Sequence, residues 1–426
     1  MEQHQDRVDV LIIGGGTAGT VAAIQAARAG AHTAIIEMHG QLGGTLTVGG
    51  VAAPAYFFNK DRQVIAGIGW ELVVKAKALD GSSYPDFGNP SPTRPSFHVS
   101  VNPLLYTLVS EETCMEAGVE LHYHELLTGI QPTNRGWTVT TVGKGLERTI
   151  QAREVIDCTG DADAVGLLGM ERLRGDVRQP GTLIFKFGGY QVADLDMEVV
   201  QEHFEQAQRE GRLQPGDFWL AEDRPFIDFL RNGGTNAQHI FGADSSTSHT
   251  QTQANIAGRQ AVLRLLRFIR SLPGCGQAEL LTMQTAAAVR ETYRIAGEAT
   301  ITYEDYMGGR LFEDALCYSL YFIDVHTERG VEHEIVPEGR IPTVPFGALI
   351  PRGSQRLLVA GRSVSSDRLA NSALRVEASC MAMGQAAGAA AALGALRGIP
   401  SRAVPIDDIR SLLREHGAIV PPPAQA

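Results

Sequence analysis

The sequence predicts an α/β fold in which a Rossmann-like domain, made of a parallel sheet and a β-meander, carries an inserted α+β domain. An apolar, β-branched run at 8–13 leads through a glycine-rich turn into an alanine-rich helix. Alternating apolar and polar residues between 119 and 152 indicate antiparallel strands. Residues 166–345 lack a second strand and glycine turn of this kind and contain helices rich in polar residues. The apolar run at 357–360 again resembles a buried strand. At 426 residues, two domains are expected.

Residues 8–37 have the order expected of a dinucleotide-binding βαβ unit. Gly14, Gly16 and Gly19 follow the first strand at G-x-G-x-x-G spacing and open the helix. In such a turn the first glycine permits a tight bend, the second lets the backbone approach a diphosphate, and the third lets helix and strand pack closely. Glu37 ends the second strand, where a carboxylate accepts hydrogen bonds from a ribose diol. We therefore predict a dinucleotide site here.

The loop after this unit is unusually rich in glycine and threonine. Residues 43–50 hold four glycines and two threonines in eight positions. Bare backbone there can pass against a flat ring or a phosphate, and the hydroxyls can hydrogen-bond it. A flexible connector is the alternative explanation.

The remaining elements are expected in the following order. Helices are expected at 69–79 and 103–117, meander strands at 119–124, 127–131, 137–142 and 148–152, and a buried strand at 155–158. The next region should hold a strand at 182–187 and helices at 195–210 and 251–271, followed by a strand at 357–360 and one long helix at 371–393. The expected division is a discontinuous domain, 1–165 with 341–420, and an inserted domain, 166–340.

Charge and cysteine content narrow the class of partners. The net charge of -11 disfavours nucleic acid and anionic membranes, because both are negatively charged. We expect no membrane span, since no apolar run has the necessary length, and the N-terminus lacks a signal-peptide pattern. The five cysteines form no C-x-x-C pair, which argues against a redox dithiol, a zinc site or an iron–sulfur cluster. A cytoplasmic location is expected.

Six motifs make the chain resemble a known family. They are IIGGGTAGTVAAIQAARAG (12–30), LGGTLTVGGV (42–51), VIDCTGDADAVGLLG (155–169), RQPGTL (178–183), VRETYRIAGE (289–298) and VAGRSVSSDRLANSALRVEASCMAMGQAAGAAAAL (359–393). In this combination and order they are similar to those of flavin-dependent oxidoreductases of the glutathione-reductase-type fold, in the branch related to fumarate reductase flavoproteins. The resemblance extends from about residue 8 to 400.

The resemblance implies that the discontinuous domain binds FAD, without a covalent link because no attachment motif is found. The segment 159–161 would lie near the adenosine half of FAD, and 361–362 with the last long helix near the isoalloxazine. The positive end of that helix would favour negative charge on the flavin. The residues expected to contact FAD are Gly14, Gly16, Thr17, Ala18, Gly19, Glu37, Met38, Gly43, Gly44, Thr45, Thr47, Gly49, Gly50, Thr159, Gly160, Asp161, Gly361, Arg362, Asn371, Ser372, Leu374 and Arg375.

Arg290, Arg294 and His239 are the candidates for catalysis. The two arginines lie four residues apart and would share a face if their segment is helical. They can bind a substrate carboxylate or donate a proton, or they can pair with Glu291 and Glu298 instead. His239 lies in the inserted domain, where a structural role is the alternative. Further candidates are Arg178, Tyr293, His98, His249 and His326. No metal site is expected, because the spacing of Asp324, His326, Glu328 and His333 fits no ligand pattern.

These observations indicate an FAD-dependent oxidoreductase that transfers a hydride between a small polar organic substrate and the flavin. Only one G-x-G-x-x-G follows a strand, so a dedicated NAD(P)H domain is not supported. Two alternatives stay open: a flavoprotein subunit that passes electrons to a partner, and a flavin-bearing RNA-modifying module, which the negative charge disfavours. Homo-oligomer formation, an electron-acceptor partner, the substrate and the direction of reaction are left undetermined.

Overall fold

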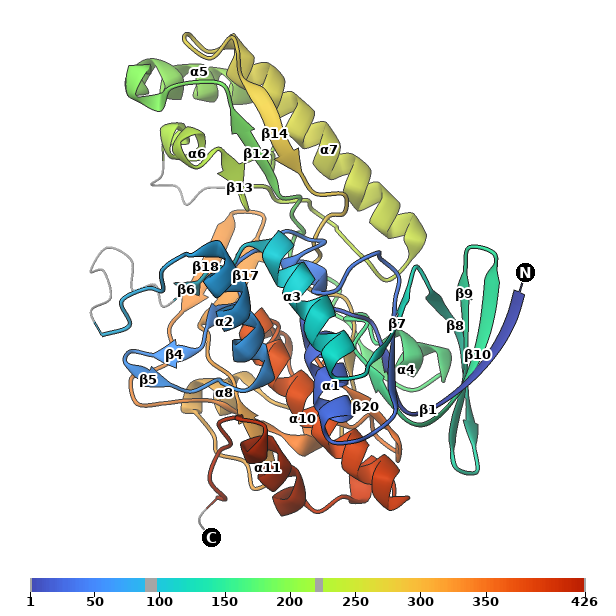
Figure 1. Ribbon diagram of the computed structural model, residues 1–426. Helices are drawn as coiled ribbons and strands as arrows, with labels where there is room; N and C mark the ends of the chain where they lie inside the picture. Colours follow the sequence, from blue (N-terminus) through green and yellow to red (C-terminus); the bar gives the residue numbers. More distant parts are fainter. Residues whose placement is uncertain (1, 89–97, 219–224, 425–426) are drawn as a thin grey trace.

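Strands from both ends of the chain meet in one sheet in the computed structural model, which describes residues 2–88, 98–218 and 225–424 (Figure 1). The parallel strands are β1 (Glu2–Ile13), β2 (Thr33–Glu37), β7 (Glu120–Tyr123), the end of β10 (Leu146–Asp157) and β20 (Leu357–Val359), in the order β7-β2-β1-β10-β20. Alternate residues of β1 face opposite sides of this sheet, so Val10 and Ile12 join one core cluster, and Leu11 and Ile13 another. The predicted Rossmann-like parallel sheet is confirmed.

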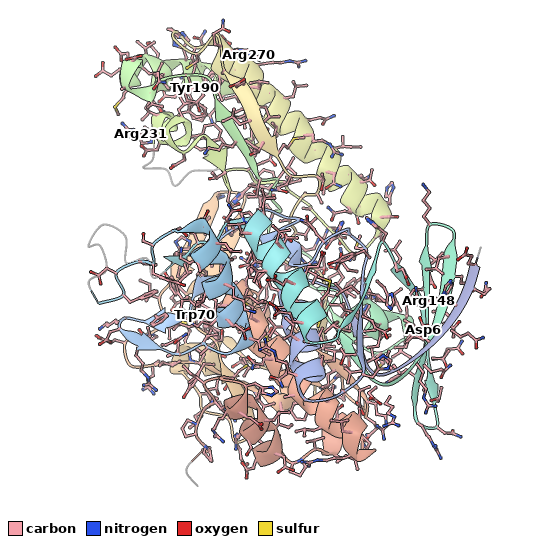
Figure 2. All side chains as sticks on the ribbon, in the orientation of Figure 1. Asp6, Trp70, Arg148, Tyr190, Arg231 and Arg270 are labelled. Atoms are coloured by element: carbon pink, nitrogen blue, oxygen red, sulfur yellow. The ribbon has the colours of Figure 1, made fainter. Side chains whose placement is uncertain are left out.

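The β-meander is also present, but one predicted strand belongs elsewhere. It consists of β8 (Leu126–Thr133), β9 (Gly136–Gly143) and the first half of β10, which continues without a break into the parallel sheet. The segment expected at 119–124 forms β7 instead and runs parallel to β2. The helix α3 (Pro103–Glu116) precedes β7 and acts as a crossover, which sets its parallel direction. Figure 2 shows Asp6 beside Arg148, an ion pair that joins the long N-terminal part of β1 to β10.

Two helices, α1 (Thr17–Arg28) and α10 (Glu377–Arg397), pack closely against each other on one face of the sheet. A Cβ at Gly384 would lie 2.1 Å from the Ala18 carbonyl oxygen, and a Cβ at Gly388 would lie 2.5 Å from the Ala22 oxygen. These distances are too short for any larger residue. The glycine and alanine content of α10 therefore permits its close approach to the helix that follows the G-x-G-x-x-G turn.

The expected helix at 371–393 is two helices. α9 (Arg368–Leu374) ends at Arg375, and Val376 is extended, with φ -72° and ψ 143°, before α10 begins. The Arg375 guanidinium donates to the Asp324 carboxylate at 3.2 Å, a long-range contact that the local pattern does not encode. The interruption creates a new helix N-terminus at Val376 and Glu377, inside the protein rather than at 371.

α10 also corrects the expectation that no segment has the length and hydropathy of a membrane span. The helix passes that test by length and composition, with a mean hydropathy of 1.3 in its most apolar window. However, 83% of that window is buried inside the protein, as in the core helix of a globular domain. The test is therefore weak evidence for a membrane span.

A second hydrophobic cluster, whose members run from Leu183 to Val289, forms a separate unit that we call the cap. Its antiparallel sheet has the order β13-β12-β14, from β12 (Phe185–Gly188), β13 (Gly234–Thr235) and β14 (Glu279–Met283). Its helices are α5 (Met197–Arg209), α6 (Phe226–Asn232) and α7 (Ser248–Ser271). These elements lie at the top of Figure 1, above the larger unit that we call the body.

The remaining elements lie in the body or in the connections to the cap. They are α2 (Ile68–Asp80), α4 (Asp163–Leu167), α8 (Tyr303–Gly308), α11 (Ile406–Glu415), β3 (Ala55–Tyr56), β4 (Phe58–Asn59), β5 (Arg62–Gln63), β6 (His98–Val99), β11 (Arg172–Leu173), β15 (Arg294–Ile295), β16 (Ala315–Tyr318), β17 (Ile323–Thr327), β18 (Gly330–Glu334) and β19 (Thr343–Pro345), with short 3₁₀ turns at Gly44–Leu46, Val192–Asp194, Phe346–Leu349 and Ser401–Ala403. Residues 301–325 pack in the core of the body. The division at 165/166 and 340/341 stays a prediction.

Candidate functional site

A cavity of about 930 Å³ lies between the body and the cap. The body contributes the turn after β1, the glycine–threonine loop, the end of β10, residues 360–362 and the start of α10. The cap contributes the start of α7 and residues 286–289. This volume is near the upper end of the range of about 300–1,000 Å³ that ligand pockets span. A large, elongated ligand therefore fits it.

Two of the three glycines after β1 are required by close packing, and the third leaves its backbone open. A Cβ at Gly14, where φ is +97°, would lie 2.6 Å from the Cys158 carbonyl oxygen, so the tight turn requires glycine. A Cβ at Gly19 would lie 1.9 Å from the Gly14 oxygen, so helix and strand could not pack. At Gly16 the nearest atom, a Gly44 Cα, is 4.0 Å away, and the residue lines the cavity. The backbone is therefore bare where a diphosphate would approach.

The N-terminus of α1 opens onto the same part of the cavity. Thr17 and Ala18, the first residues of the helix, both line the cavity. No side chain of the described residues caps this helix end. Its N–H groups and the positive end of its dipole are therefore available to phosphate oxygens. Glycine cradle and uncapped helix together fit the diphosphate of a dinucleotide.

Glu37 lies at the end of β2 beside the cavity, but its carboxylate is already engaged. It accepts hydrogen bonds from the Gly15 N–H at 2.6 Å and the His39 N–H at 2.7 Å. Burial raises the pKa of Glu37, and these two N–H groups oppose that shift. Met38 lines the cavity next to it. Carboxylate lone pairs remain for a ribose diol.

The glycine–threonine loop divides into residues that face the cavity and residues that hold the loop. Gly44, Thr45 and Gly49 line the cavity. Gly43, at φ +99°, donates its N–H to the Gly15 oxygen at 2.8 Å, and the Thr47 hydroxyl donates to the Leu42 oxygen at 2.6 Å. Gly50 is held against Gln284 of the cap connection, 2.6 Å from where its Cβ would lie. The loop is therefore ordered by its own hydrogen bonds and is no flexible connector.

The Arg362 side chain forms hydrogen bonds both to the segment after β10 and to the segment that leaves the cap. Its Nε donates to the Gly160 oxygen at 2.7 Å, its Nη1 to the Val289 oxygen at 2.6 Å, and its Nη2 to the Asp161 carboxylate at 2.7 Å. The Ser245 hydroxyl also donates to that carboxylate, at 2.9 Å. Arg362 therefore crosslinks three segments at the cavity wall, with Thr159, Gly160 and Gly361 beside it.

The N-terminus of α10 opens onto the cavity, through Val376 and Glu377. No side chain in the described part of the chain caps it. Burial raises the pKa of Glu377 to about 7. Of the residues predicted to contact the flavin here, Arg375 lines the cavity. Asn371, Ser372 and Leu374 do not: the Asn371 amide donates to the Arg362 oxygen, the Ser372 hydroxyl to the Leu369 oxygen, and Leu374 is core.

Arg290 is a buried cation on the cavity wall. Its side chain donates to the Pro180 oxygen at 2.6 Å and to the Asn236 amide oxygen at 3.2 Å, and no carboxylate of the described residues forms an ion pair with it. Burial, together with the nearby Arg375 guanidinium, lowers its pKa to about 9. A bound anion would remove this unfavourable environment.

Asp324 forms an ion pair with Arg375 but not with Arg290. Its carboxylate accepts from Arg375 at 3.2 Å and from His333 at 3.1 Å, and it lies 3.4 Å from the His326 ring. These partners hold the pKa of Asp324 well below its ordinary value, despite burial that raises it. Asp324 attracts Arg290 without a direct contact, so the Arg290 guanidinium stays open to a closer anionic partner.

Two predicted catalytic residues do not line the cavity. The segment that carries Arg290 and Arg294 is not helical, so the two arginines do not share a face, and Arg294 donates to the Ser366 oxygen at 3.0 Å within β15. His239 is buried behind the wall, with its Nε2 2.8 Å from the His326 Nδ1. Burial lowers the pKa of His239 to about 3. Their catalytic assignment stays a prediction that this placement does not favour.

Some residues of the wall were not predicted. They include Thr182, Tyr321, Arg172, Asp163 and the hydroxyl-rich segment 245–248 that leads into α7. Thr182 lies in the motif RQPGTL, so a sequence signal existed for it. The others come from segments whose position depends on how the cap and the β17 hairpin meet the body. Within the described ranges, no group of three or more His, Cys, Asp or Glu side chains is arranged to hold a metal ion.

Comparison with known proteins agrees with this geometry. A family model described as FAD dependent oxidoreductase matches residues 9–413. No curated protein matches the sequence. Among solved structures, a geranylgeranyl bacteriochlorophyll reductase-like protein from Thermoplasma acidophilum is 11% identical, with a TM-score of 0.45, over 97% of this chain and 82% of that one. The anhydrotetracycline hydroxylase OxyS from Streptomyces rimosus is 12% identical, with a TM-score of 0.44, over 96% and 66%.

Proposed function

The chain belongs to the FAD dependent oxidoreductase family, and from that premise we propose that it transfers a hydride between a small carboxylate-bearing substrate and non-covalently bound FAD. FAD supplies the hydride-accepting or hydride-donating chemistry at its N5 atom when bound. The carboxylate-bearing substrate and the kinship with fumarate reductase flavoproteins are parts of this proposal.

The observation that supports it is the environment of Arg290. This guanidinium is 7% exposed, lines the same cavity as the Gly16 backbone, and pairs with no carboxylate of the described residues. An isolated buried cation is costly, and a substrate anion is the simplest group that offsets it. A guanidinium also matches a carboxylate with two parallel hydrogen bonds, which orients the substrate as well as binding it.

The other residues of this end of the cavity have supporting roles in the proposal. Asp324 holds Arg375 in place, so that a second guanidinium faces the ligand. The cap segment 286–289 lines the cavity next to Arg290, and its apolar side chains lower the local polarity, which strengthens the attraction between guanidinium and carboxylate.

The test is to purify the protein, record its visible spectrum, and titrate the FAD-loaded protein with malonate, succinate and benzoate while following the flavin absorbance. We expect at least one carboxylate to perturb the spectrum. Arg290→Gln should weaken that binding by about 10- to 150-fold, since a hydrogen bond to a charged group contributes about 1.5–3 kcal/mol. Arg290→Lys should lose less, because it keeps the charge. The exposed Arg267→Gln on α7 is the control and should bind like the wild type.

Three outcomes would contradict the proposal. A protein that cannot be reconstituted with FAD would refute the cofactor part. Equal carboxylate affinity in wild type and Arg290→Gln would refute the substrate class. Loss of flavin in Arg290→Gln would show that the residue serves the cofactor or the fold instead. An anaerobic screen of hydroxy acids, amino acids and enoates for flavin bleaching then identifies the reacting bond.

A further inference from the structure

One hydroxyl on the cavity wall lacks a hydrogen-bond partner. The Thr182 side chain is 1% exposed, and its Oγ1 atom is buried with no partner among residues 2–88, 98–218 and 225–424. Thr182 lines the cavity. A buried hydroxyl without a partner destabilises the fold, so such atoms are rare in native proteins unless a ligand satisfies them.

The backbone of Thr182 is firmly held, so the side chain has a defined place. Its N–H donates to the Ala288 oxygen at 2.9 Å, and its carbonyl accepts from the Ala288 N–H at 2.8 Å. This bridge connects the entry of the chain into the cap with the segment that leaves it. Arg290 is two residues beyond Ala288 and donates to the oxygen of Pro180, two residues before Thr182. Thr182 and Arg290 therefore belong to one rigid element.

A second hydrogen-bond donor, on a residue that lines the cavity, also lacks an acceptor in the part of the chain that the structure describes. The Nε of Arg375 is buried and has no partner in the described ranges, whereas its Nη2 is engaged by Gln179 and Asp324. Arg375 lines the cavity with Thr182 and Arg290. Among the described residues, the Thr182 hydroxyl and the Arg375 Nε lack acceptors, and Arg290 lacks a carboxylate partner. A single ligand with several oxygen atoms would satisfy all three groups.

We infer that the Thr182 hydroxyl is a substrate-binding group, which donates a hydrogen bond to an oxygen of the carboxylate-bearing substrate that Arg290 holds. The inference rests on the proposed function and adds a specificity-determining residue to it. Thr182 moves no proton in the reaction. It selects substrates with an acceptor oxygen at this point, because a ligand without one leaves the buried hydroxyl unsatisfied.

The test uses Thr182→Val, which replaces the hydroxyl by a methyl group of nearly the same size, and Thr182→Ser, which keeps the hydroxyl. The FAD-loaded variants are titrated with malonate, succinate and benzoate, and their FAD affinity and Tm without carboxylate are measured. Thr182→Val should weaken the carboxylate that the wild type binds by about 10-fold or more, and Thr182→Ser by less than about 3-fold. The Tm of ligand-free Thr182→Val should be unchanged or higher, because an unsatisfied hydroxyl has been removed.

Ser363→Ala is the matched control. The Ser363 hydroxyl is also buried without a partner in the described part of the chain, but the residue does not line the cavity. It should leave carboxylate affinity unchanged. Equal carboxylate affinity in wild type and Thr182→Val would overturn the inference, and so would a weaker FAD affinity with unchanged carboxylate affinity, since the partner would then be the flavin. A wild type that binds none of the three carboxylates would refute the proposed function itself.

Discussion

Replacing Gly16 by alanine separates cofactor binding from folding. Gly16 precedes α1 at φ -65° and ψ -175°, a conformation that alanine adopts without strain. A Cβ there would meet nothing closer than the Gly44 Cα at 4.0 Å. At Gly19, by contrast, a Cβ would lie 1.9 Å from the Gly14 carbonyl oxygen. The same substitution at the two positions should therefore have opposite consequences.

The expected magnitudes follow from these distances. In Gly16→Ala the new methyl group stands where the diphosphate approaches the N–H groups of α1. Loss of one hydrogen bond to a charged phosphate costs about 1.5–3 kcal/mol, so the Kd for FAD should rise by about 10- to 150-fold. The free energy of unfolding without FAD should be unchanged, or about 0.4–1 kcal/mol higher, because alanine has fewer unfolded conformations. Gly19→Ala should instead destabilise the fold by about 1–3 kcal/mol or more.

Two measurements decide this prediction. Fluorescence titration with FAD gives the Kd, and thermal unfolding followed by circular dichroism gives the Tm of the FAD-free proteins. Gly16→Ala should show weak FAD binding and an undiminished Tm, and Gly19→Ala a lower Tm. If Gly16→Ala binds FAD as tightly as the wild type, the diphosphate does not pass this backbone. If its Tm falls as far as that of Gly19→Ala, a methyl group at Gly16 collides with neighbouring atoms and the space there is not open.

Three further predictions concern the contacts around the cavity. Burial lowers the pKa of His239 to about 3 and that of His326 to about 4, so the unfolded chain binds more protons below its ordinary His pKa of about 6.5. The free energy of unfolding should thus fall as pH drops from about 6.5 to 4, and substitution of both histidines by Asn should flatten the Tm–pH curve relative to the wild type. Arg362→Gln should lower the Tm by breaking the crosslink between β10 and the cap; an unchanged Tm in a thermal shift assay would contradict that role. Gly384→Ala should lower both the Tm and the FAD affinity, since its Cβ would lie 2.1 Å from the Ala18 oxygen and displace α1; calorimetry of FAD binding tests this.

The cofactor end of the site was predictable because its determinants are local. The order of strand, glycines, helix and acidic residue specifies a βαβ unit, and the structure places Gly14, Gly16 and Glu37 accordingly. The prediction of FAD contacts was less accurate for residues whose side chains hydrogen-bond the protein's own backbone. Thr47 and Asn371 hold the backbone of their loops, and a sequence pattern does not distinguish such a hydrogen bond from a contact with a ligand.

The interruption at Val376 shows a different limit. Residues 371–393 have helical composition throughout, and the helix is nevertheless broken where Arg375 reaches Asp324, a residue 51 positions away in the chain. Likewise, β7 has the alternation of a meander strand, but the α3 crossover determines its parallel pairing. Local propensity predicts that an element forms, whereas its neighbours decide where it ends and which strand it joins.

The sequence by itself determined the FAD-binding half of this protein, because bare backbone, tight turns and close helix packing depend on where glycine occurs. Only the tertiary structure decided the composition of the opposite end of the cavity. Thr182, Arg290 and Arg375 come from three distant segments of the chain. The fold brings the unpartnered Thr182 hydroxyl and Arg375 Nε to the same cavity as Arg290, which hydrogen-bonds only neutral oxygens among the described residues. Charge compensation and hydrogen-bond satisfaction are properties of neighbours in space, so this part of the function could not be read from spacing along the chain.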